Sequence, residues 1–151
     1  MKKIQTVGLI VENGKILLGM KKRGFGKGKW NGFGGNLEQG ETPEQAMRRE
    51  FFEEASVKVS KLREVGLINF SFTDDPVEPE VHFFEILKYH GDPTESEEML
   101  PKWFDIADIP YDSMWPDDKY WVPLFLAGKS FRGNFLFGEK GEIIKYNIHE
   151  V

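Results

Sequence analysis

The stretch that most constrains the fold of this chain is GGNLEQGETPEQAMRREFFEEASV, residues 34–57. Thr42 is a favourable helix N-cap, Pro43 suits the first helical position, and Gln45 completes a capping box with Thr42. The apolar residues at positions 46, 47, 51 and 55 recur at helical spacing and supply one face that can pack on a core. The stretch therefore predicts an amphipathic helix that follows a glycine-containing loop.

Three glutamates of this helix, Glu50, Glu53 and Glu54, stand at positions i, i+3 and i+4. Residues at that spacing fall in one sector of an α-helix, so we expect the three carboxylates to point the same way. Like charges on one face repel, and a divalent cation removes the repulsion. Carboxylate oxygens suit Mg²⁺ or Mn²⁺, which take further ligands from water and from substrate phosphates. A solvated acidic helix face is the alternative, but the glycine loop, the capped helix start and Arg49 at fixed distances favour a metal site.

The stretch resembles the Nudix box, G-x5-E-x7-R-E-U-x-E-E-x-G-U, in which U is a bulky apolar residue. The matching residues are Gly35, Glu41, Arg49, Glu50, Phe51, Glu53, Glu54 and Val57. Ser56 departs from the pattern, which has glycine at that position. Glycine there would suit a left-handed residue that closes the helix, so the departure concerns the end of the helix and leaves the carboxylates intact.

The rest of the chain alternates between strand-like and loop-like segments. We expect strands at residues 4–11, 15–20, 57–73, 80–89, 101–104, 131–137 and 142–148, loops at 74–79 and 91–100, a turn at 108–113, and a second helix at 119–127. Asn13-Gly14 favours a type I′ turn between the first two strands, and Gly66 indicates a bulge in the long strand. This order predicts an α+β fold, a mixed sheet flanked by two main helices, in one domain of residues 1–151.

The loop that follows the first hairpin contains many glycines together with Phe25, Trp30, Asn31 and Phe33. Glycine lets a backbone approach a ligand closely, and the aromatic residues indicate a ligand with a flat face. A plain surface loop with a basic flank is the alternative interpretation. His82, on a predicted strand, is interpreted as an ordinary packed or exposed residue.

Three further segments, LLGMKKRGFGKGKWNGFGG, ESEEM and MWPDDKYWVPL, are similar to those of the oxidised purine nucleoside triphosphatases, the MutT-homologue branch of the Nudix hydrolases. The similarity covers essentially the whole chain. It implies an α/β/α Nudix fold and Mg²⁺-dependent hydrolysis of a damaged purine nucleoside triphosphate, such as 8-oxo-dGTP or 2-hydroxy-dATP, to monophosphate and pyrophosphate. It also implies a base pocket that contains Phe25, Asn31, Phe70, Phe72, Met99, Trp115, Asp117 and Asp118, with Thr6 and Lys21 near the sugar or base.

The chemistry of the side chains independently supports these implied roles in base binding. Trp115 can stack on a purine, and Asn31 offers a donor and an acceptor to a base edge. Asp117 and Asp118 are adjacent in an aromatic setting, where two ionised carboxylates are costly, so we expect one of them to hold a proton. One carboxyl can then donate to a base carbonyl while the other accepts from a ring N–H. Helix N-capping by this pair is the alternative.

The metal ligands expected from the box are Glu50, Glu53 and Glu54 with a backbone carbonyl of Gly34 or Gly35, and Glu98 is a further candidate. One of Glu53, Glu54 and Glu98 is expected to take the proton from the attacking water. Arg49 is expected to pair with a box carboxylate and fix its orientation.

Composition excludes several other classes of protein. The net charge of −5 argues against binding of nucleic-acid polymers, and the absence of cysteine excludes disulfides and thiolate chemistry. No apolar run is long enough for a membrane span and no signal-peptide pattern is present, so we expect a cytoplasmic protein, and we expect a monomer. Two alternatives remain: a Nudix hydrolase for another nucleoside diphosphate-linked substrate, and a Nudix module that binds nucleotides without catalysis.

Overall fold

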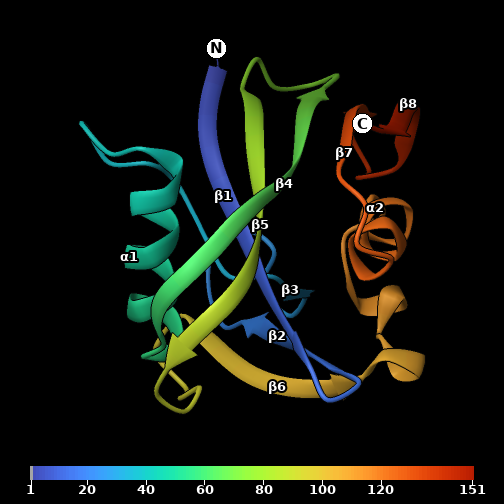
Figure 1. Ribbon diagram of the computed structural model, residues 1–151. Coiled ribbons are helices and arrows are strands. Elements are labelled where there is room, and N and C mark those ends of the chain that lie inside the picture. The colour runs from blue at the N-terminus through green and yellow to red at the C-terminus, as the bar shows by residue number, and fades with distance from the viewer. Residues whose placement is uncertain (1) are drawn as a thin grey trace.

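A computed structural model describes residues 2–151, and its strands form one mixed sheet (Figure 1). The elements are β1 (Lys2–Glu12), β2 (Lys15–Lys21), β3 (Trp30–Asn31), α1 (Pro43–Ala55), β4 (Lys58–Phe72), β5 (Glu78–His90), β6 (Met99–Asp105), the 3₁₀ turns Ile106–Asp108 and Tyr111–Ser113, α2 (Asp118–Leu126), β7 (Phe131–Phe137) and β8 (Ile143–Glu150). The strand order is β3-β2-β1-β5-β4-β7-β8, and β6 pairs with β2. The pairs β1·β5 and β4·β7 are parallel and the other pairs are antiparallel, as expected for a mixed sheet.

The two main helices lie on opposite sides of this sheet (Figure 1). Helix α1 places Met47 and Phe51, both with no exposed surface, in one hydrophobic cluster with Phe84 of β5. Helix α2 places Trp121 in the other cluster, where its ring centroid lies 4.4 Å from that of Phe83 and 5.8 Å from that of Phe131. Adjacent residues of β5, Phe83 and Phe84, thus face opposite helices, as alternation along a strand requires. The predicted sheet flanked by two helices is confirmed. No helix of residues 2–151 is both long enough and apolar enough to cross a bilayer.

Both ends of α1 follow from local sequence. Thr42 and Gln45 form the predicted capping box: the Gln45 N–H donates to Oγ1 of Thr42 (3.2 Å) and the Thr42 N–H donates to Oε1 of Gln45 (2.9 Å). At the other end Ser56 is left-handed, with φ 59° and ψ 25°, and its N–H donates to the carbonyl of Phe52. Ser56 therefore adopts the backbone conformation for which the family pattern uses glycine.

Other local predictions agree with the structure, but several strand boundaries were wrong, and the short strand β3 lies in a segment that was predicted to be a loop. Asn13 and Gly14 have φ values of 52° and 74°, as a type I′ turn requires, and the β4·β5 register shifts just before Gly66. Strand β5 begins at Glu78, inside the predicted loop 74–79, because residues 78 and 79 pair with the start of β1. Strand β6 begins at Met99, inside the predicted loop 91–100, because Met99 pairs with Lys21.

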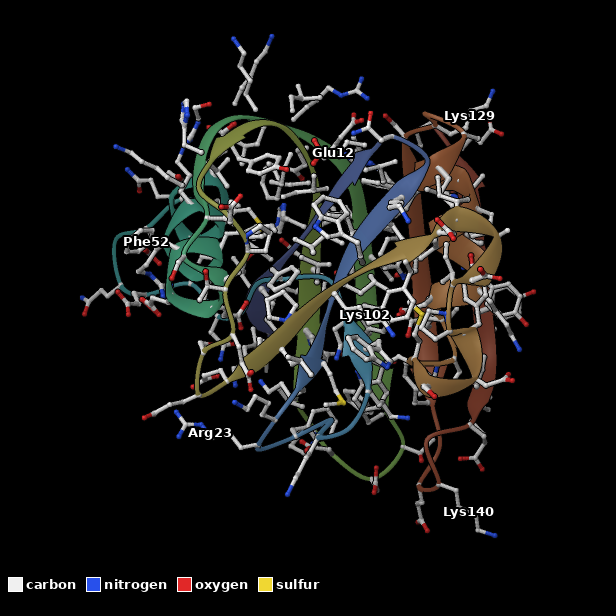
Figure 2. The ribbon with its side chains drawn as sticks, turned by 90° about the horizontal axis from the view of Figure 1, so that it is seen from below. Glu12, Arg23, Phe52, Lys102, Lys129 and Lys140 are labelled. Atoms are coloured by element: carbon white, nitrogen blue, oxygen red, sulfur yellow. The ribbon has the colours of Figure 1, made fainter. Side chains whose placement is uncertain are left out.

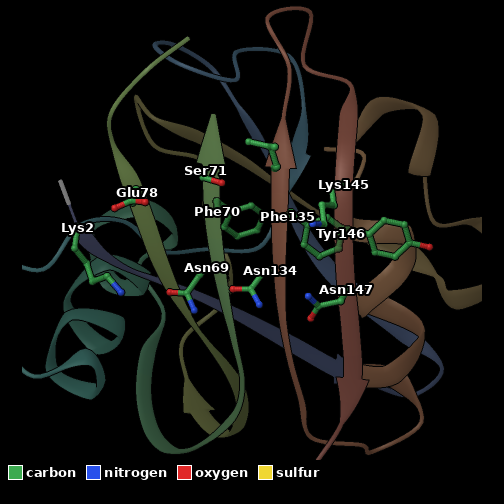
Figure 3. Close-up of a pocket in the computed structure, with 11 residues that line it drawn as sticks. Lys2, Asn69, Phe70, Ser71, Glu78, Asn134, Phe135, Lys145, Tyr146 and Asn147 are labelled. Atoms are coloured by element: carbon green, nitrogen blue, oxygen red, sulfur yellow. The ribbon is translucent and has the colours of Figure 1, made fainter. Parts of the chain in front are cut away.

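Charged side chains cover the outside of the molecule, and Phe52 projects from the outer side of α1 with 58% of its surface exposed (Figure 2). The sheet also carries a polar row on one face, where the strand pairing aligns Asn69, Asn134 and Asn147 (Figure 3). They line a cavity of about 230 Å³ whose lining shares no residue with the box helix. Its lining contains a single carboxylate, Glu78, whereas several carboxylates gather beside α1.

Candidate active site

Four polar or charged residues are buried within residues 2–151: Thr6, Glu54, Asp117 and Asp118. Burial of such groups is costly, and their presence in a cleft points to a functional role. All four belong to the site residues expected from the sequence. Glu54 lines an acidic region next to α1 and Thr6 bonds to Gly35 of the glycine loop, whereas Asp117 and Asp118 lie at the start of α2.

The acidic region is a cavity of about 450 Å³, lined by Arg23, Glu50, Glu53, Glu54, Ser96, Glu97 and Glu98. The three box glutamates therefore share one space, as their spacing on α1 predicts. Glu98, which immediately precedes β6, joins them there. The structure thus brings together all four carboxylates that the sequence singled out for metal binding and catalysis.

Glu54 is the deepest of these carboxylates. Its Oε1 accepts a hydrogen bond of 2.9 Å from the Gly34 N–H. Burial raises the pKa of Glu54 to about 8, and the charges of Glu50 and Glu98 contribute to the rise against the lowering effects of the Gly34 N–H and Lys21. Burial also raises the pKa of Glu50. Burial thus makes ionisation of both carboxyls less favourable, and a nearby positive charge opposes this effect.

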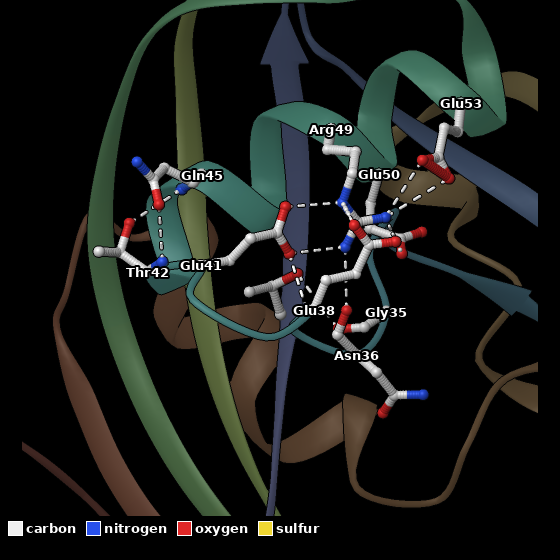
Figure 4. A network of polar contacts seen from close by, with 10 residues as sticks. Gly35, Asn36, Glu38, Glu41, Thr42, Gln45, Arg49, Glu50 and Glu53 are labelled. Atoms are coloured by element: carbon white, nitrogen blue, oxygen red, sulfur yellow. Dashed lines mark hydrogen bonds and ion pairs between the residues drawn. The ribbon is translucent and has the colours of Figure 1, made fainter.

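Arg49 connects the box carboxylates to one another (Figure 4). Its Nε and Nη2 donate to the two oxygens of Glu41, at 2.7 and 2.9 Å, and Nη2 also donates to the carbonyl of Asn36 at 3.1 Å. Its Nη1 donates to Oε1 of Glu50 at 2.9 Å and to Oε1 of Glu53 at 3.2 Å. The hydrogen bonds from Arg49 hold the pKa of Glu41 at about 2. Every nitrogen of this guanidinium is occupied, so Arg49 fixes the orientation of Glu50 and Glu53.

The Gly34-Gly35 pair packs tightly between β1 and α1. A Cβ on Gly34, whose φ is 155°, would lie 1.8 Å from the carbonyl oxygen of Thr6, and a Cβ on Gly35 would lie 2.9 Å from the Glu50 carboxylate. The Thr6 N–H donates to the carbonyl of Gly35 at 2.9 Å. Buried Thr6 therefore holds the glycine pair in place, and only glycine fits at both positions.

An aromatic stack forms the second half of the site. The rings of Phe25 and Trp115 are stacked with centroids 5.1 Å apart, although Phe25 is 79% exposed. Nζ of Lys29 lies 5.0 Å from the Trp115 ring, and the Lys29 carbonyl accepts from Nδ2 of Asn31 at 3.0 Å. The predicted base-reading residues Phe25, Asn31 and Trp115 thus gather along the glycine-rich loop.

Asp117 and Asp118 both accept a hydrogen bond from Nε1 of Trp121, each at 3.1 Å. Burial raises the pKa of Asp117, while burial and the neighbouring charge of Asp117 raise the pKa of Asp118 well above its usual range. The Asp117 side chain makes no capping hydrogen bond to α2, which argues against the helix-capping alternative. The geometry therefore favours a pair that shares a proton. Trp121 was missed as a site residue, although its spacing from the two aspartates on a helix was a readable signal.

The remaining predicted residues are distributed differently. Phe70 and Phe72 stack on Phe137, with centroids 5.9 Å away in each case, so they line the side of the sheet that carries the α2 cluster. Met99 is 2% exposed and packs in the α1 cluster, with its Cε 2.6 Å from the Cβ position of Gly19. Lys21 lies near enough to Glu54 for its charge to lower the pKa of that group. Met99 therefore belongs to the hydrophobic cluster of α1, and Lys21 lies near the acidic cavity.

The sequence was compared with a protein-family model and with known proteins. The family model described as NUDIX domain matches residues 2–125. The chain belongs to the NUDIX family. It is similar to the oxidized purine nucleoside triphosphate hydrolase of Mus musculus, 47% identical over 149 residues that cover 99% of this chain and 96% of the relative. The protein of the same description from Danio rerio is 49% identical over the same coverage.

Solved structures confirm the Nudix α/β/α fold. The mutator MutT protein from Bacillus halodurans superposes with a TM-score of 0.87 at 22% identity, covering 97% of both chains. The MutT protein from Methanosarcina mazei superposes with a TM-score of 0.72 at 21% identity, covering 84% of this chain and 94% of that one. At such identities the likeness concerns the fold alone.

Nudix hydrolases generally need a divalent metal, and the donors of the acidic cavity fit one. They are hard carboxylate oxygens, and the raised pKa values of Glu50 and Glu54 reflect charge that a cation would compensate. In residues 2–151 no three acidic, histidine or cysteine side chains already converge on a single metal position. The side chains do not converge because Glu50 and Glu53 accept hydrogen bonds from Arg49, while Glu54 accepts one from the Gly34 N–H. Glu50 keeps its second oxygen free of Arg49, so binding of an ion requires chiefly that Glu54 turn away from Gly34.

Proposed function

We propose that this protein hydrolyses oxidised purine nucleoside triphosphates, such as 8-oxo-dGTP and 2-hydroxy-dATP, to monophosphate and pyrophosphate and so removes them from the nucleotide pool. The observation that carries the proposal is that the three buried carboxyls divide between an acidic cavity, which contains Glu54, and the Asp117–Asp118 pair. The first half suits a metal-bound triphosphate and the second suits a base edge with both a donor and an acceptor. The two near-full-length relatives named as oxidized purine nucleoside triphosphate hydrolases support the same substrate class.

The phosphate half of the site depends on Mg²⁺, with Mn²⁺ as a substitute. Glu50, Glu53, Glu54 and Glu98 would hold the ion, with a carbonyl of Gly34 or Gly35. When bound, the ion neutralises the anionic triphosphate and helps to orient the attacking water.

The protein's own groups supply the remaining chemistry. Arg49 keeps Glu50 and Glu53 in a fixed orientation. Glu53, Glu54 or Glu98 takes the proton from the water, a role that contributes roughly 10²–10⁴-fold to the rate. The attacking water forms a new P–O bond while the phosphoanhydride bond between the α- and β-phosphates breaks. The products are the nucleoside monophosphate and pyrophosphate.

The base half of the site recognises the damaged purine. Phe25 and Trp115 hold the ring by stacking, and Asn31 binds a polar edge. Asp117 and Asp118 share one proton, so one carboxyl donates to a base carbonyl while the other accepts from a ring N–H. Phe70 and Phe72 close the pocket with apolar surface, whereas Met99 packs in the α1 cluster, and Thr6 and Lys21 lie near the sugar or base.

We also propose that the protein acts in the cytoplasm as a monomeric single domain of residues 1–151, with small nucleotides as its binding partners. The nucleotide substrate and the cysteine-free sequence support this setting.

The test is pyrophosphate release from 8-oxo-dGTP, 2-hydroxy-dATP, dGTP and ADP-ribose, with and without Mg²⁺. We expect the two oxidised nucleotides to be preferred and all turnover to need the ion. Glu54→Gln should lose about 10²–10⁴-fold in turnover, whereas Glu44→Gln, an exposed glutamate in the first turn of the same helix, should stay near wild type. Preference for ADP-ribose would support the alternative Nudix substrate, and nucleotide binding without turnover would support a non-catalytic module.

A further inference from the structure

Arg23 lines the acidic cavity and makes fewer polar contacts than Arg49 does. Nη2 of Arg23 donates to Oε1 of Glu98 at 3.0 Å, and Nη1 lies 3.6 Å from Oε2 of Glu97. Arg23 is the basic residue among the seven that line the cavity. It lies at the periphery of the molecule, beyond the end of β2 (Figure 2).

The ion pair between Arg23 and Glu98 is weakly held. The Arg23 side chain is 59% exposed and that of Glu98 is 45% exposed, and exposed pairs of this kind contribute little to stability. A polyphosphate carries more charge than one carboxylate and matches the planar guanidinium fork with paired oxygens. The Arg23 guanidinium is therefore free to exchange Glu98 for phosphate, whereas Arg49, with all its nitrogens occupied, is not.

The same loop reaches the aromatic stack two residues later. Gly24 has φ 79°, and after it Phe25 stacks on Trp115. A Cβ on Gly26 would lie 3.1 Å from the Trp115 ring, so the loop backbone itself lies close to the stack. The start of the loop is fixed, because the Lys22 N–H donates to the carbonyl of Glu98 and Nζ of Lys22 bonds to Glu95. Arg23 thus lies on a short segment between the anchored Lys22 and the stacked Phe25.

We propose that Arg23 binds the phosphates that leave as pyrophosphate, freeing the Glu98 carboxylate that lines the acidic cavity, and that this exchange couples phosphate binding to stacking of the base on the Phe25–Trp115 pair. The inference rests on the proposed function and adds to it a link between the two halves of the site. It assigns Arg23 to substrate binding and to the positioning of Phe25.

The first experiment measures equilibrium binding of two ligands, 8-oxo-dGMP and the non-hydrolysable α,β-imido analogue of 8-oxo-dGTP. Arg23→Gln should weaken binding of the analogue by about tenfold to a hundredfold and change binding of the monophosphate by less than about threefold. Arg23→Lys keeps the charge but loses the fork, so its loss should be intermediate. Lys27→Gln is the matched control, because Lys27 is an exposed cation of the same loop that does not line the cavity, and it should leave both affinities unchanged.

The second experiment tests the coupling by a double-mutant cycle with Phe25→Ala. For the triphosphate analogue, Phe25→Ala should cost at least about threefold less in the Arg23→Gln background than in wild type. For 8-oxo-dGMP the cost should be the same in both backgrounds. If Phe25→Ala weakens binding of the triphosphate analogue equally in wild type and in the Arg23→Gln background, the coupling is overturned.

These experiments distinguish failure of the Arg23 proposal from failure of the proposed hydrolase function. Unchanged binding of the analogue by Arg23→Gln, or equal weakening of both ligands, would overturn phosphate binding by Arg23 while wild-type turnover of 8-oxo-dGTP left the proposed function standing. Wild-type protein that does not hydrolyse 8-oxo-dGTP would overturn both.

Discussion

Glu54→Gln is expected to stabilise the metal-free protein at neutral and alkaline pH. The pKa of Glu54 is raised from its ordinary value of 4.5 to about 8, a rise that corresponds to roughly 5 kcal/mol. Below pH 4.5 the carboxyl is protonated in both the folded and the unfolded state. Between pH 4.5 and 8 the unfolded chain releases this proton and the folded chain keeps it, so the wild type loses stability as pH rises. The amide introduced by the substitution does not titrate, and its oxygen can still accept from the Gly34 N–H.

The free energy of unfolding should therefore be measured by urea titration in EDTA at several pH values between about 5 and 8. The advantage of Glu54→Gln over wild type should grow by up to ~1.4 kcal/mol per pH unit and level off above about pH 8. Addition of Mg²⁺ at the upper end of this range should raise the stability of the wild type and not that of the variant. Glu44→Gln, on the exposed first turn of α1, is the matched control for the loss of one carboxylate from the same helix. An advantage of Glu54→Gln that is constant across the range would refute the argument that burial suppresses ionisation of Glu54.

Three other substitutions test separate parts of the structure. Ser56→Gly should stabilise the protein by about 0.5–1 kcal/mol, because Ser56 is left-handed and glycine relieves that strain at some entropic cost; its thermal midpoint should rise by roughly 1–4 °C, and a fall would contradict the assignment. Gly34→Ala should prevent stable folding, because its Cβ would lie 1.8 Å from the carbonyl oxygen of Thr6 at φ 155°; a cooperative melt near that of wild type would refute the tight packing. Asp117→Asn and Asp118→Asn should change the ratio of kcat/KM for 8-oxo-dGTP and 2-hydroxy-dATP by about tenfold or more, since each fixes one carboxyl as neutral; equal losses on both substrates would make the pair structural.

The features that could be predicted from the sequence are those set by near neighbours along the chain. The capping box of α1 joins residues three positions apart, and the first hairpin depends on Asn13 and Gly14 alone. The shared direction of the three box carboxylates follows from helical periodicity. Each of these depends on local geometry that any chain with the same few residues adopts.

The features that could not be predicted depend on contacts between distant segments. The position of Met99 on β6 follows from its pairing with Lys21, which no pattern around Met99 specifies, because the segment before it is acidic and Pro101 follows. The ion pair of Arg23 with Glu98 likewise needs β2 and β6 to be neighbours. The hydrogen bonds of Trp121 to both aspartates are a different case, because the spacing was readable and only the chemical partner was overlooked.

The charges of the acidic cavity form one connected arrangement. Arg49 is fixed from outside by Glu41 and the Asn36 carbonyl, so it need not leave when a cation binds. It donates to only one oxygen of Glu50, at 2.9 Å, and the other oxygen remains available as a ligand. Glu54 has no such arginine and stays protonated near neutral pH until a positive charge arrives. Cation binding must therefore release a proton from Glu54 while Glu50 is already oriented, and for this reason the affinity of the cavity for the ion rises with pH.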